Sequence, residues 1–121
     1  DFLQMNAAGS EQDHDAPDSP ESELIGGPIQ EHPDLVARAN PITYITGDEP
    51  PFLIMHGDRD PLVPHHQSVL LYDALVRAGA RDITFHTLPG AGHGGPHFDT
   101  PEARAMVAGF FDRRLMMTPG Q

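Results

Sequence analysis

Acidic side chains and a histidine follow two apolar, strand-like segments of this 121-residue chain. Residues 52–55 run into the sequence HGDRDP, which contains Asp58 and Asp60, and residues 83–88 run into PGAGHGG, which contains His93. A histidine that acts as a general base needs a carboxylate on its Nδ1, which fixes the tautomer and stabilises the imidazolium. The two loops therefore predict acid–base chemistry carried by a carboxylate and His93.

The segments around these loops predict one βαβ unit. Residues 52–55 are consecutive apolar residues, which is typical of a strand buried on both faces of a parallel sheet. Residues 83–88 alternate apolar and polar side chains and are rich in β-formers. Between them, residues 65–78 have apolar side chains at helical spacing and precede Gly79, which suits a left-handed C-terminal cap.

The predicted connection brings the two loops together. A right-handed crossover makes the two strands parallel neighbours, about 4.8 Å apart. Functional groups in open α/β sheets gather beyond the carboxyl ends of the strands. We therefore expect Asp60 and His93 to meet at one edge of the sheet, within about 3.2 Å of each other.

Two further helices complete the predicted α/β fold. Residues 32–39 fit a short helix that ends at Asn40 and Pro41, and residues 101–115 fit a longer helix that should pack on the sheet. Two parallel strands alone do not make a stable sheet. We therefore expect the chain to be the C-terminal portion of a larger domain, with either a missing N-terminal part or another copy of the chain covering the open sheet edge.

The first part of the chain has a different composition. Nine of the 18 carboxylates lie within residues 1–34, and residues 6–23 contain almost no large apolar side chain. Such a segment cannot bury enough surface to offset the entropy lost on ordering. We predict an acidic loop segment over residues 1–31, and a βαβα unit over residues 32–121.

Charge and cysteine content exclude several classes of function. The chain has 18 Asp and Glu residues against 7 Arg and no Lys, giving a formal net charge of −11. Nucleic acids and anionic membranes are bound mainly through Lys and Arg, so neither partner is expected. No apolar stretch approaches the roughly 20 residues that cross a bilayer. Because the sequence has no Cys, disulfides, thiolate metal sites and cysteine nucleophiles are excluded.

The motifs resemble a known superfamily. The run HGDRDPLVPHHQSVLLYDAL, followed further along by GAGHG, closely resembles the C-terminal third of α/β-hydrolases. Within them, SPESELIGGPIQ, NPITYI and PPFLIMHGDRDPLVP are similar to the esterase/lipase group that includes feruloyl-esterase-like and acetyl-esterase-like enzymes. The resemblance covers roughly residues 18–115. It implies that Asp60 is the acid and His93 the base of a catalytic triad.

The same resemblance implies a substrate class and a lid. Ester substrates are implied, including acyl or feruloyl groups on carbohydrate, and no cofactor is implied. The N-terminal segment of residues 1–31 would be lid-like and lie over the catalytic edge. Its apolar contacts for an acyl or aryl group would be Leu24, Ile25 and Ile29.

The nucleophile of these enzymes has no counterpart in the sequence. It lies in a G-x-S-x-G turn between a strand and a helix, and none of the four serines, Ser10, Ser19, Ser22 and Ser68, has that context. An HGGG-like oxyanion loop is also absent. Because the superfamily order is serine, acid, histidine, we expect both parts upstream and expect this chain alone to be inactive.

Several alternatives remain open for individual residues. Asp60 could cap the next helix or close an Asx-turn, and Asp58 could serve loop hydrogen bonding or support the Asp60 turn. His56 is expected to be a partly buried histidine with its hydrogen bonds satisfied. The remaining histidines near the motifs are expected at the surface: His65, His66 and His97.

Alternatives also remain open for the function as a whole. A metal-dependent hydrolase could use zinc-competent nitrogen and oxygen donors among His56, Asp58, Asp60, His93 and His97. A peptidase of the prolyl-oligopeptidase type shares the same acid and base segments. A binding module without catalysis would equally lack a nucleophile.

Overall fold

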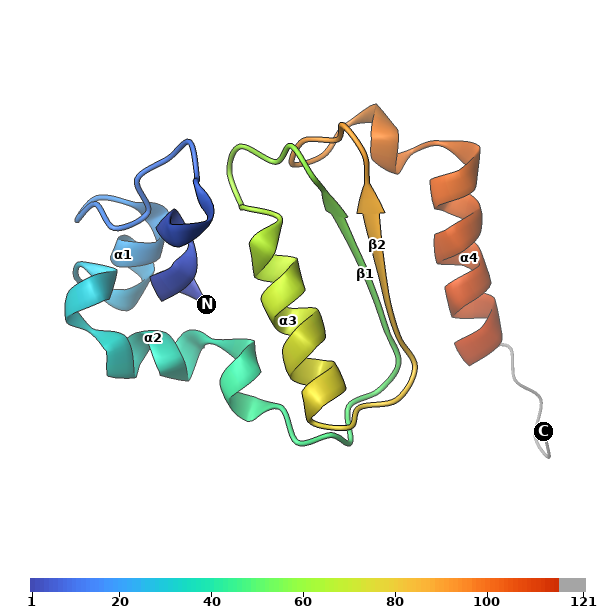
Figure 1. Cartoon of the computed structure of the whole chain (residues 1–121), viewed down its shortest axis with the longest axis horizontal. Helices are drawn as coiled ribbons and strands as arrows, with labels where there is room; N and C mark the ends of the chain where they lie inside the picture. Colours follow the sequence, from blue (N-terminus) through green and yellow to red (C-terminus); the bar gives the residue numbers. More distant parts are fainter. Residues whose placement is uncertain (116–121) are drawn as a thin grey trace.

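Two parallel strands with helices on both sides organise the second half of the chain in the computed structural model, which describes residues 1–115 (Figure 1). Strand β1 (Phe52–Gly57) pairs in parallel with β2 (Ile83–Leu88), with Phe52 opposite Ile83 and Gly57 opposite Leu88. Helix α3 (His66–Arg77) connects them. The predicted βαβ unit is confirmed.

The core of this unit lies between the strands and α3. Opposite residues of a parallel pair point to the same face, so Ile54 and Phe85 both face α3. The Phe85 ring packs against Tyr72 of the helix, with ring centroids 5.7 Å apart. Leu75 of α3 is fully buried, and Gly79 follows the helix at a φ of 86°. The helical spacing and the glycine stop therefore identified this helix correctly.

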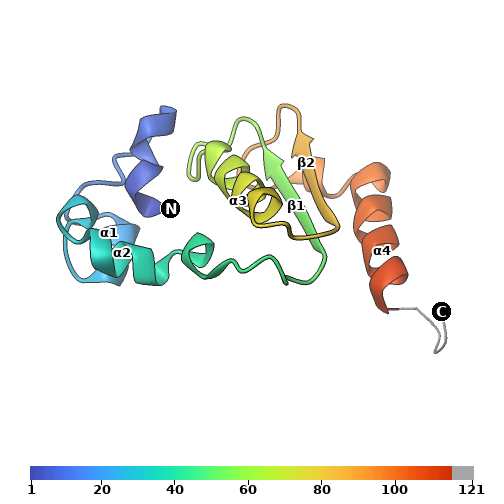
Figure 2. The ribbon, with the colours of Figure 1, turned by 60° about the horizontal axis from the view of Figure 1, so that its bottom comes forward.

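Helix α4 (Pro101–Leu115) lies on the side of the strands opposite α3, as both views show (Figures 1 and 2). It is reached through a short 3-10 helix, Pro96–Phe98. Ala103 is buried, and Arg114 forms an ion pair with Asp82, the residue before β2. Phe111 and Leu115 are exposed, the latter by 73%. The apolar face of this predicted helix is therefore only partly covered.

The part of the chain before β1 contains short helices. Helix α1 (Pro20–Ile25) and helix α2 (Pro33–Ala39) are accompanied by 3-10 helices Phe2–Gln4, Asn6–Ala8, Ile29–Glu31 and Pro41–Tyr44. The prediction of a loop was therefore wrong for α1. Ser19 caps α1 by accepting a hydrogen bond from the Ser22 amide, and Pro20 suits the first helical turn.

Hydrogen bonds allow this segment to bury polar groups. Ser19, Ser22 and His14 are buried together with Met5, Ile29 and Val36. Buried polar groups are tolerated when they are hydrogen-bonded, and the Ser19 hydroxyl donates to the His14 carbonyl at 2.7 Å. The low apolar content of residues 6–23 therefore did not prevent local packing. Among the described residues, the helices are all too short or too polar to cross a membrane.

Candidate active site

The loops that follow β1 and β2 are bonded to each other. The Arg59 amide donates to the Ala91 carbonyl at 2.9 Å, and the Asp58 amide donates to the Leu88 carbonyl at 3.3 Å. Gly57 makes this approach possible, because a Cβ atom there would collide with the backbone carbonyls of the second loop. The carboxyl edge of the sheet therefore joins the two predicted loops into one site.

Asp60 and His93 meet at this edge, as expected. The Oδ2 atom of Asp60 lies 2.9 Å from Nδ1 of His93. The Asp60 side chain is 4% exposed, whereas the His93 side chain is 55% exposed. The contact holds the Nδ1 side of the ring against a buried carboxylate and leaves much of the imidazole open.

The other oxygen of Asp60 closes a turn. Oδ1 accepts hydrogen bonds from the amides of Leu62 at 2.9 Å and Val63 at 2.8 Å. This is the Asx-turn that the sequence left open as an alternative, and it coexists with the histidine contact on Oδ2. Burial alone would raise the pKa of Asp60. Hydrogen bonds from the Val63 amide, His93 and the Leu62 amide outweigh that effect and hold the pKa below its ordinary value.

Asp58 has a different task from Asp60. Its Oδ1 accepts a hydrogen bond from the Gly90 amide at 2.7 Å. The side chain thus ties the loop after β1 to the loop that carries His93. This confirms loop hydrogen bonding as the role of Asp58.

His56 is partly buried and hydrogen-bonded, as predicted, but it also reaches Asp60. Its Nδ1 lies 2.5 Å from the Ser68 hydroxyl, and its Nε2 lies 3.0 Å from the Val63 carbonyl oxygen. The same Nε2 is 3.2 Å from Oδ2 of Asp60. Its place four residues before Asp60 was the available sequence signal, but the spacing alone does not reveal whether the two side chains converge.

The other histidines near the site divide into two groups. His66 and His97 are exposed, as predicted. The surface prediction was wrong for His65, which is half-buried, with its Nε2 2.8 Å from the Thr87 hydroxyl and its ring 5.2 Å from that of Phe85. Burial is the main cause that lowers the pKa of His65.

Two hollows border Asp60. One of about 180 Å³ also contains His93, and its walls are formed by Met55, His56, Asp60, Val63, His93 and Phe98. The other, of about 360 Å³, separates the N-terminal segment from the loop after β1 and from the start of α3. It is lined by Gly9, Ser10, Glu11, Asp58, Arg59, Asp60, Pro64, His65 and His66. The first hollow offers apolar walls beside the imidazole, and the second is bordered by charged and polar groups.

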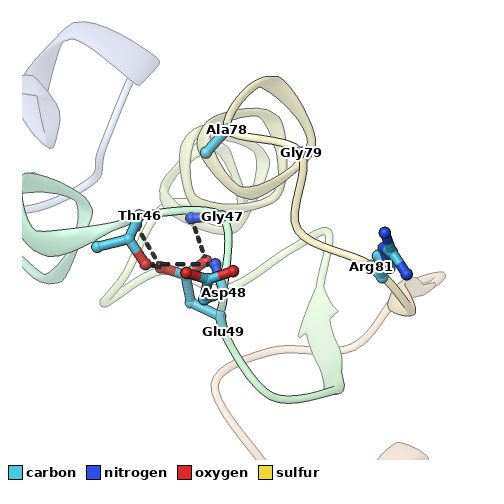
Figure 3. Close-up of a pocket in the computed structure, with 7 residues that line it drawn as sticks. All are labelled: Thr46, Gly47, Asp48, Glu49, Ala78, Gly79 and Arg81. Carbon is cyan, nitrogen blue, oxygen red and sulfur yellow. Dashed lines mark hydrogen bonds between the residues drawn. The ribbon is translucent and has the colours of Figure 1, made fainter.

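A larger hollow, of about 460 Å³, lies among residues 46–49 and Ala78, Gly79 and Arg81 (Figure 3). These segments precede β1 and β2, so this hollow is at the opposite end of the strands from His93. The Glu49 carboxylate accepts hydrogen bonds from the amides of Thr46 and Gly47, and the bond from Thr46 is the main cause that lowers its pKa. Among the residues lining this hollow there is no histidine beside a carboxylate, so size alone does not identify the site.

The N-terminal segment contains a second chain of serine, histidine and carboxylate, which sequence reasoning missed. The Ser10 hydroxyl lies 2.9 Å from Nε2 of His14, and Nδ1 of His14 lies 3.1 Å from the Glu21 carboxylate. The His14 side chain is only 3% exposed, so its ring is closed to a leaving group. Ser10 also accepts a hydrogen bond from the Gln12 amide. These hydrogen bonds therefore stabilise the packing of the N-terminal segment.

The metal alternative has no suitable cluster among residues 1–115. No group of three or more His, Asp or Glu side chains in this part of the chain is arranged to hold a metal ion.

One of the predicted acyl contacts is also corrected. Ile29 is fully buried within the N-terminal segment, so it is not available to a substrate, whereas Leu24 is exposed.

Sequence comparison identifies relatives among esterases. A family model described as BD-FAE matches residues 1–75. Esterase LipQ of Mycobacterium tuberculosis (strain ATCC 25618 / H37Rv) is 41% identical over 63 residues, which cover 52% of this chain and 15% of LipQ. Esterase LipC of the same organism is 38% identical over 66 residues, 54% of this chain and 16% of LipC. The matched region is thus a small part of each of these relatives.

Solved structures agree with this assignment. A truncated form of a carbohydrate esterase from gut microbiota has a TM-score of 0.76 and 32% identity, covering 97% of this chain and 40% of that one. A bifunctional GH43-CE protein of Bacteroides eggerthii has a TM-score of 0.73 and 36% identity, covering 81% of this chain and 12% of that one. The chain belongs to the BD-FAE family and carries part of the esterase-type α/β-hydrolase fold.

Proposed function

We propose that this chain supplies the acid and the base of a serine carboxylic ester hydrolase. Asp60 is the triad acid, His93 is the base, and the nucleophilic serine lies in a segment upstream of residue 1. The observation that carries this proposal is the 2.9 Å contact between Oδ2 of Asp60 and Nδ1 of His93, with the imidazole otherwise open. The esterase names of the relatives support the same reaction class.

The proposed reaction has two halves, acylation of the serine and hydrolysis of the acyl-enzyme, and His93 transfers a proton in each. The upstream serine attacks the acyl carbon while Nε2 of His93 takes its proton, and His93 then returns that proton to the leaving alcohol. A water molecule then gives a proton to Nε2 of His93 and attacks the acyl-enzyme, and His93 returns that proton to the serine oxygen as the carboxylic acid leaves. Asp60 accepts a hydrogen bond from the Nδ1–H group of His93 and stabilises the imidazolium in both halves of the reaction. The chemistry needs no cofactor.

The two hollows beside Asp60 suit an ester of a carbohydrate. The 180 Å³ hollow has Met55, Val63 and Phe98 beside His93, and these apolar walls suit an acyl or feruloyl group. The 360 Å³ hollow has Arg59 and His66 among its lining groups, which can hydrogen-bond to sugar hydroxyls. Two structural relatives are a carbohydrate esterase and a bifunctional GH43-CE protein, which supports this substrate class.

The N-terminal segment, residues 1–31, is proposed as a lid-like border of the site. Gly9, Ser10 and Glu11 line the 360 Å³ hollow opposite the loop after β1. The buried hydrogen bonds of Ser19 and His14 hold the rest of the segment together behind them. Residues 32–121 form the proposed unit that positions the acid and the base.

Hydrolysis of p-nitrophenyl acetate tests this function. The 121-residue chain alone should show no turnover above that of free imidazole, because it supplies neither the nucleophile nor the oxyanion donors. In a longer protein that carries both, His93→Ala should lower kcat by roughly 10⁴-fold or more. His97→Ala is the matched control, because His97 is exposed and is expected to leave kcat near the wild-type value.

Two results would reject the proposal. One is a saturable rate from the 121-residue chain that depends on His93 and matches that of ordinary esterases. The other is a longer protein that hydrolyses the ester and keeps its kcat after His93→Ala.

A further inference from the structure

One oxygen of Asp60 is shared by two histidines. Oδ2 lies 2.9 Å from Nδ1 of His93 and 3.2 Å from Nε2 of His56. The two rings come from different elements, since His56 belongs to β1 and His93 follows β2. His56 is also the more enclosed ring, with a side chain that is 11% exposed.

The partners of His56 determine where its proton lies. Its Nε2 faces the Val63 carbonyl oxygen at 3.0 Å as well as the Asp60 carboxylate. Both of these groups only accept hydrogen bonds when the carboxylate is ionised, so Nε2 must carry the hydrogen. In the neutral ring Nδ1 then accepts the hydroxyl proton of Ser68, which lies 2.5 Å away in α3.

Together these contacts limit the orientation of the Asp60 carboxylate. The amides of Leu62 and Val63 donate hydrogen bonds to Oδ1. Oδ2 lies 3.2 Å from Nε2 of His56, whose own hydrogen bond goes to the Val63 carbonyl in the same turn. Rotation of the carboxylate would therefore break the two hydrogen bonds on Oδ1 and move Oδ2 away from both rings. The remaining direction on Oδ2 is the one that His93 occupies.

We propose that His56 is a positioning residue that holds Asp60 in line with His93, and that Ser68 holds His56 in the tautomer this task requires. The proposal rests on the proposed function, since it explains how the acid stays aligned with the base. It links the end of β1, the Asx-turn and the first turn of α3 in a single hydrogen-bonded path. The His65 ring, 5.5 Å from that of His56 and nearly edge-on to it, closes one flank of this path.

Two substitutions of His56 separate positioning from packing. A Gln amide can place an N–H group near the position of Nε2, whereas an Asn amide reaches only the position of Nδ1. His56→Gln should therefore preserve the hydrogen bond to the Val63 carbonyl and the N–H contact with Asp60, and His56→Asn should lose both. Ser68→Ala tests the same path without changing the ring, because it removes the group that fixes the tautomer.

NMR of the 121-residue chain gives the direct readout. Wild-type protein should show His56 protonated on Nε2 and a hydrogen-bonded Nδ1 proton on His93. The His93 signal should persist in His56→Gln and be lost in His56→Asn, and Ser68→Ala should broaden the His56 signal. The Leu62 and Val63 amide signals report whether the Asx-turn remains folded, and His97→Asn is the control substitution. If His56→Asn unfolds, the comparison of Ser68→Ala with wild type still decides.

Kinetics in the longer, nucleophile-containing protein provide the second measurement. The loss of the hydrogen bond to the Val63 carbonyl, and with it the N–H contact on Asp60, predicts a fall in kcat of about tenfold for His56→Asn, with activity restored in His56→Gln. The proposal is overturned if His56→Asn keeps both the His93 signal and kcat, or if His56→Gln falls as far as His56→Asn. Failure of the proposed function would give a different result from failure of the positioning role of His56. If Asp60 and His93 do not catalyse ester hydrolysis, Asp60→Asn would abolish the His93 signal and leave ester hydrolysis unchanged.

Discussion

At the scale of single residues, the two carboxylate oxygens of Asp60 make two different contacts. Oδ1 closes the Asx-turn, and Oδ2 faces His93. Asp58, two residues earlier, instead accepts a hydrogen bond from the Gly90 amide. The two motifs predicted the contact between Asp60 and His93. Which of the two Asp60 oxygens makes which contact depends on backbone geometry that the motifs do not encode.

The lowered pKa of Asp60 predicts how stability depends on pH. A carboxyl group with a folded-state pKa below its unfolded value of about 3.9 stabilises the fold above that pH, and this stabilisation is lost as pH falls through the folded-state value. Urea denaturation should therefore show wild type more stable than Asp60→Asn at neutral pH, with the difference shrinking below about pH 4. A difference that stays constant down to about pH 2 would contradict the assigned hydrogen bonds.

At the scale of elements, the site depends on how closely the loops after β1 and β2 approach. Gly57, the last residue of β1, faces the backbone carbonyls of Ala91 and Gly92 so closely that a Cβ has no room. The same loop continues into His93. A side chain at Gly57 must therefore move the histidine as well as the backbone.

Gly57→Ala should destabilise the chain by about 1–3 kcal/mol, the usual cost of overpacking. Thermal or urea unfolding monitored by circular dichroism measures this change. Gly94→Ala is the matched control, because a Cβ there meets no atom within 4 Å and Gly94 does not have a positive φ. Equal stability of the two variants would show that the loops are not packed as described.

Some helices and strands could be predicted from the sequence and others could not. The strands and α3 and α4 follow from local apolar patterns, and their bounds agree with the prediction to within one or two residues. The N-terminal segment was not predictable in this way. Its packing depends on polar pairs that are apart in sequence, such as His14 with Glu21, and no periodic pattern marks such pairs.

At the scale of the whole molecule, the described residues contain a sheet of only two strands. Parallel sheets are normally larger and covered on both faces. Helix α4 nevertheless leaves Val107, Phe111 and Leu115 exposed. The chain spans 15–16% of LipQ and LipC and 40% of the truncated carbohydrate esterase. We therefore propose that upstream strands, or a second copy of the chain, cover the open edge and the apolar face of α4.

The central claim is that Asp60, and not Asp58, is the acid partner of His93 in ester hydrolysis. The most direct test is kcat for a p-nitrophenyl ester in a nucleophile-containing protein with either Asp60→Asn or Asp58→Asn. Asp60→Asn should lower kcat by about 10⁴-fold, because the carboxylate fixes the histidine tautomer. Asp58→Asn should cost less than about tenfold, because an Asn oxygen can still accept the hydrogen bond from Gly90. If the two variants exchanged these results, or if both kept wild-type activity, the account would be contradicted.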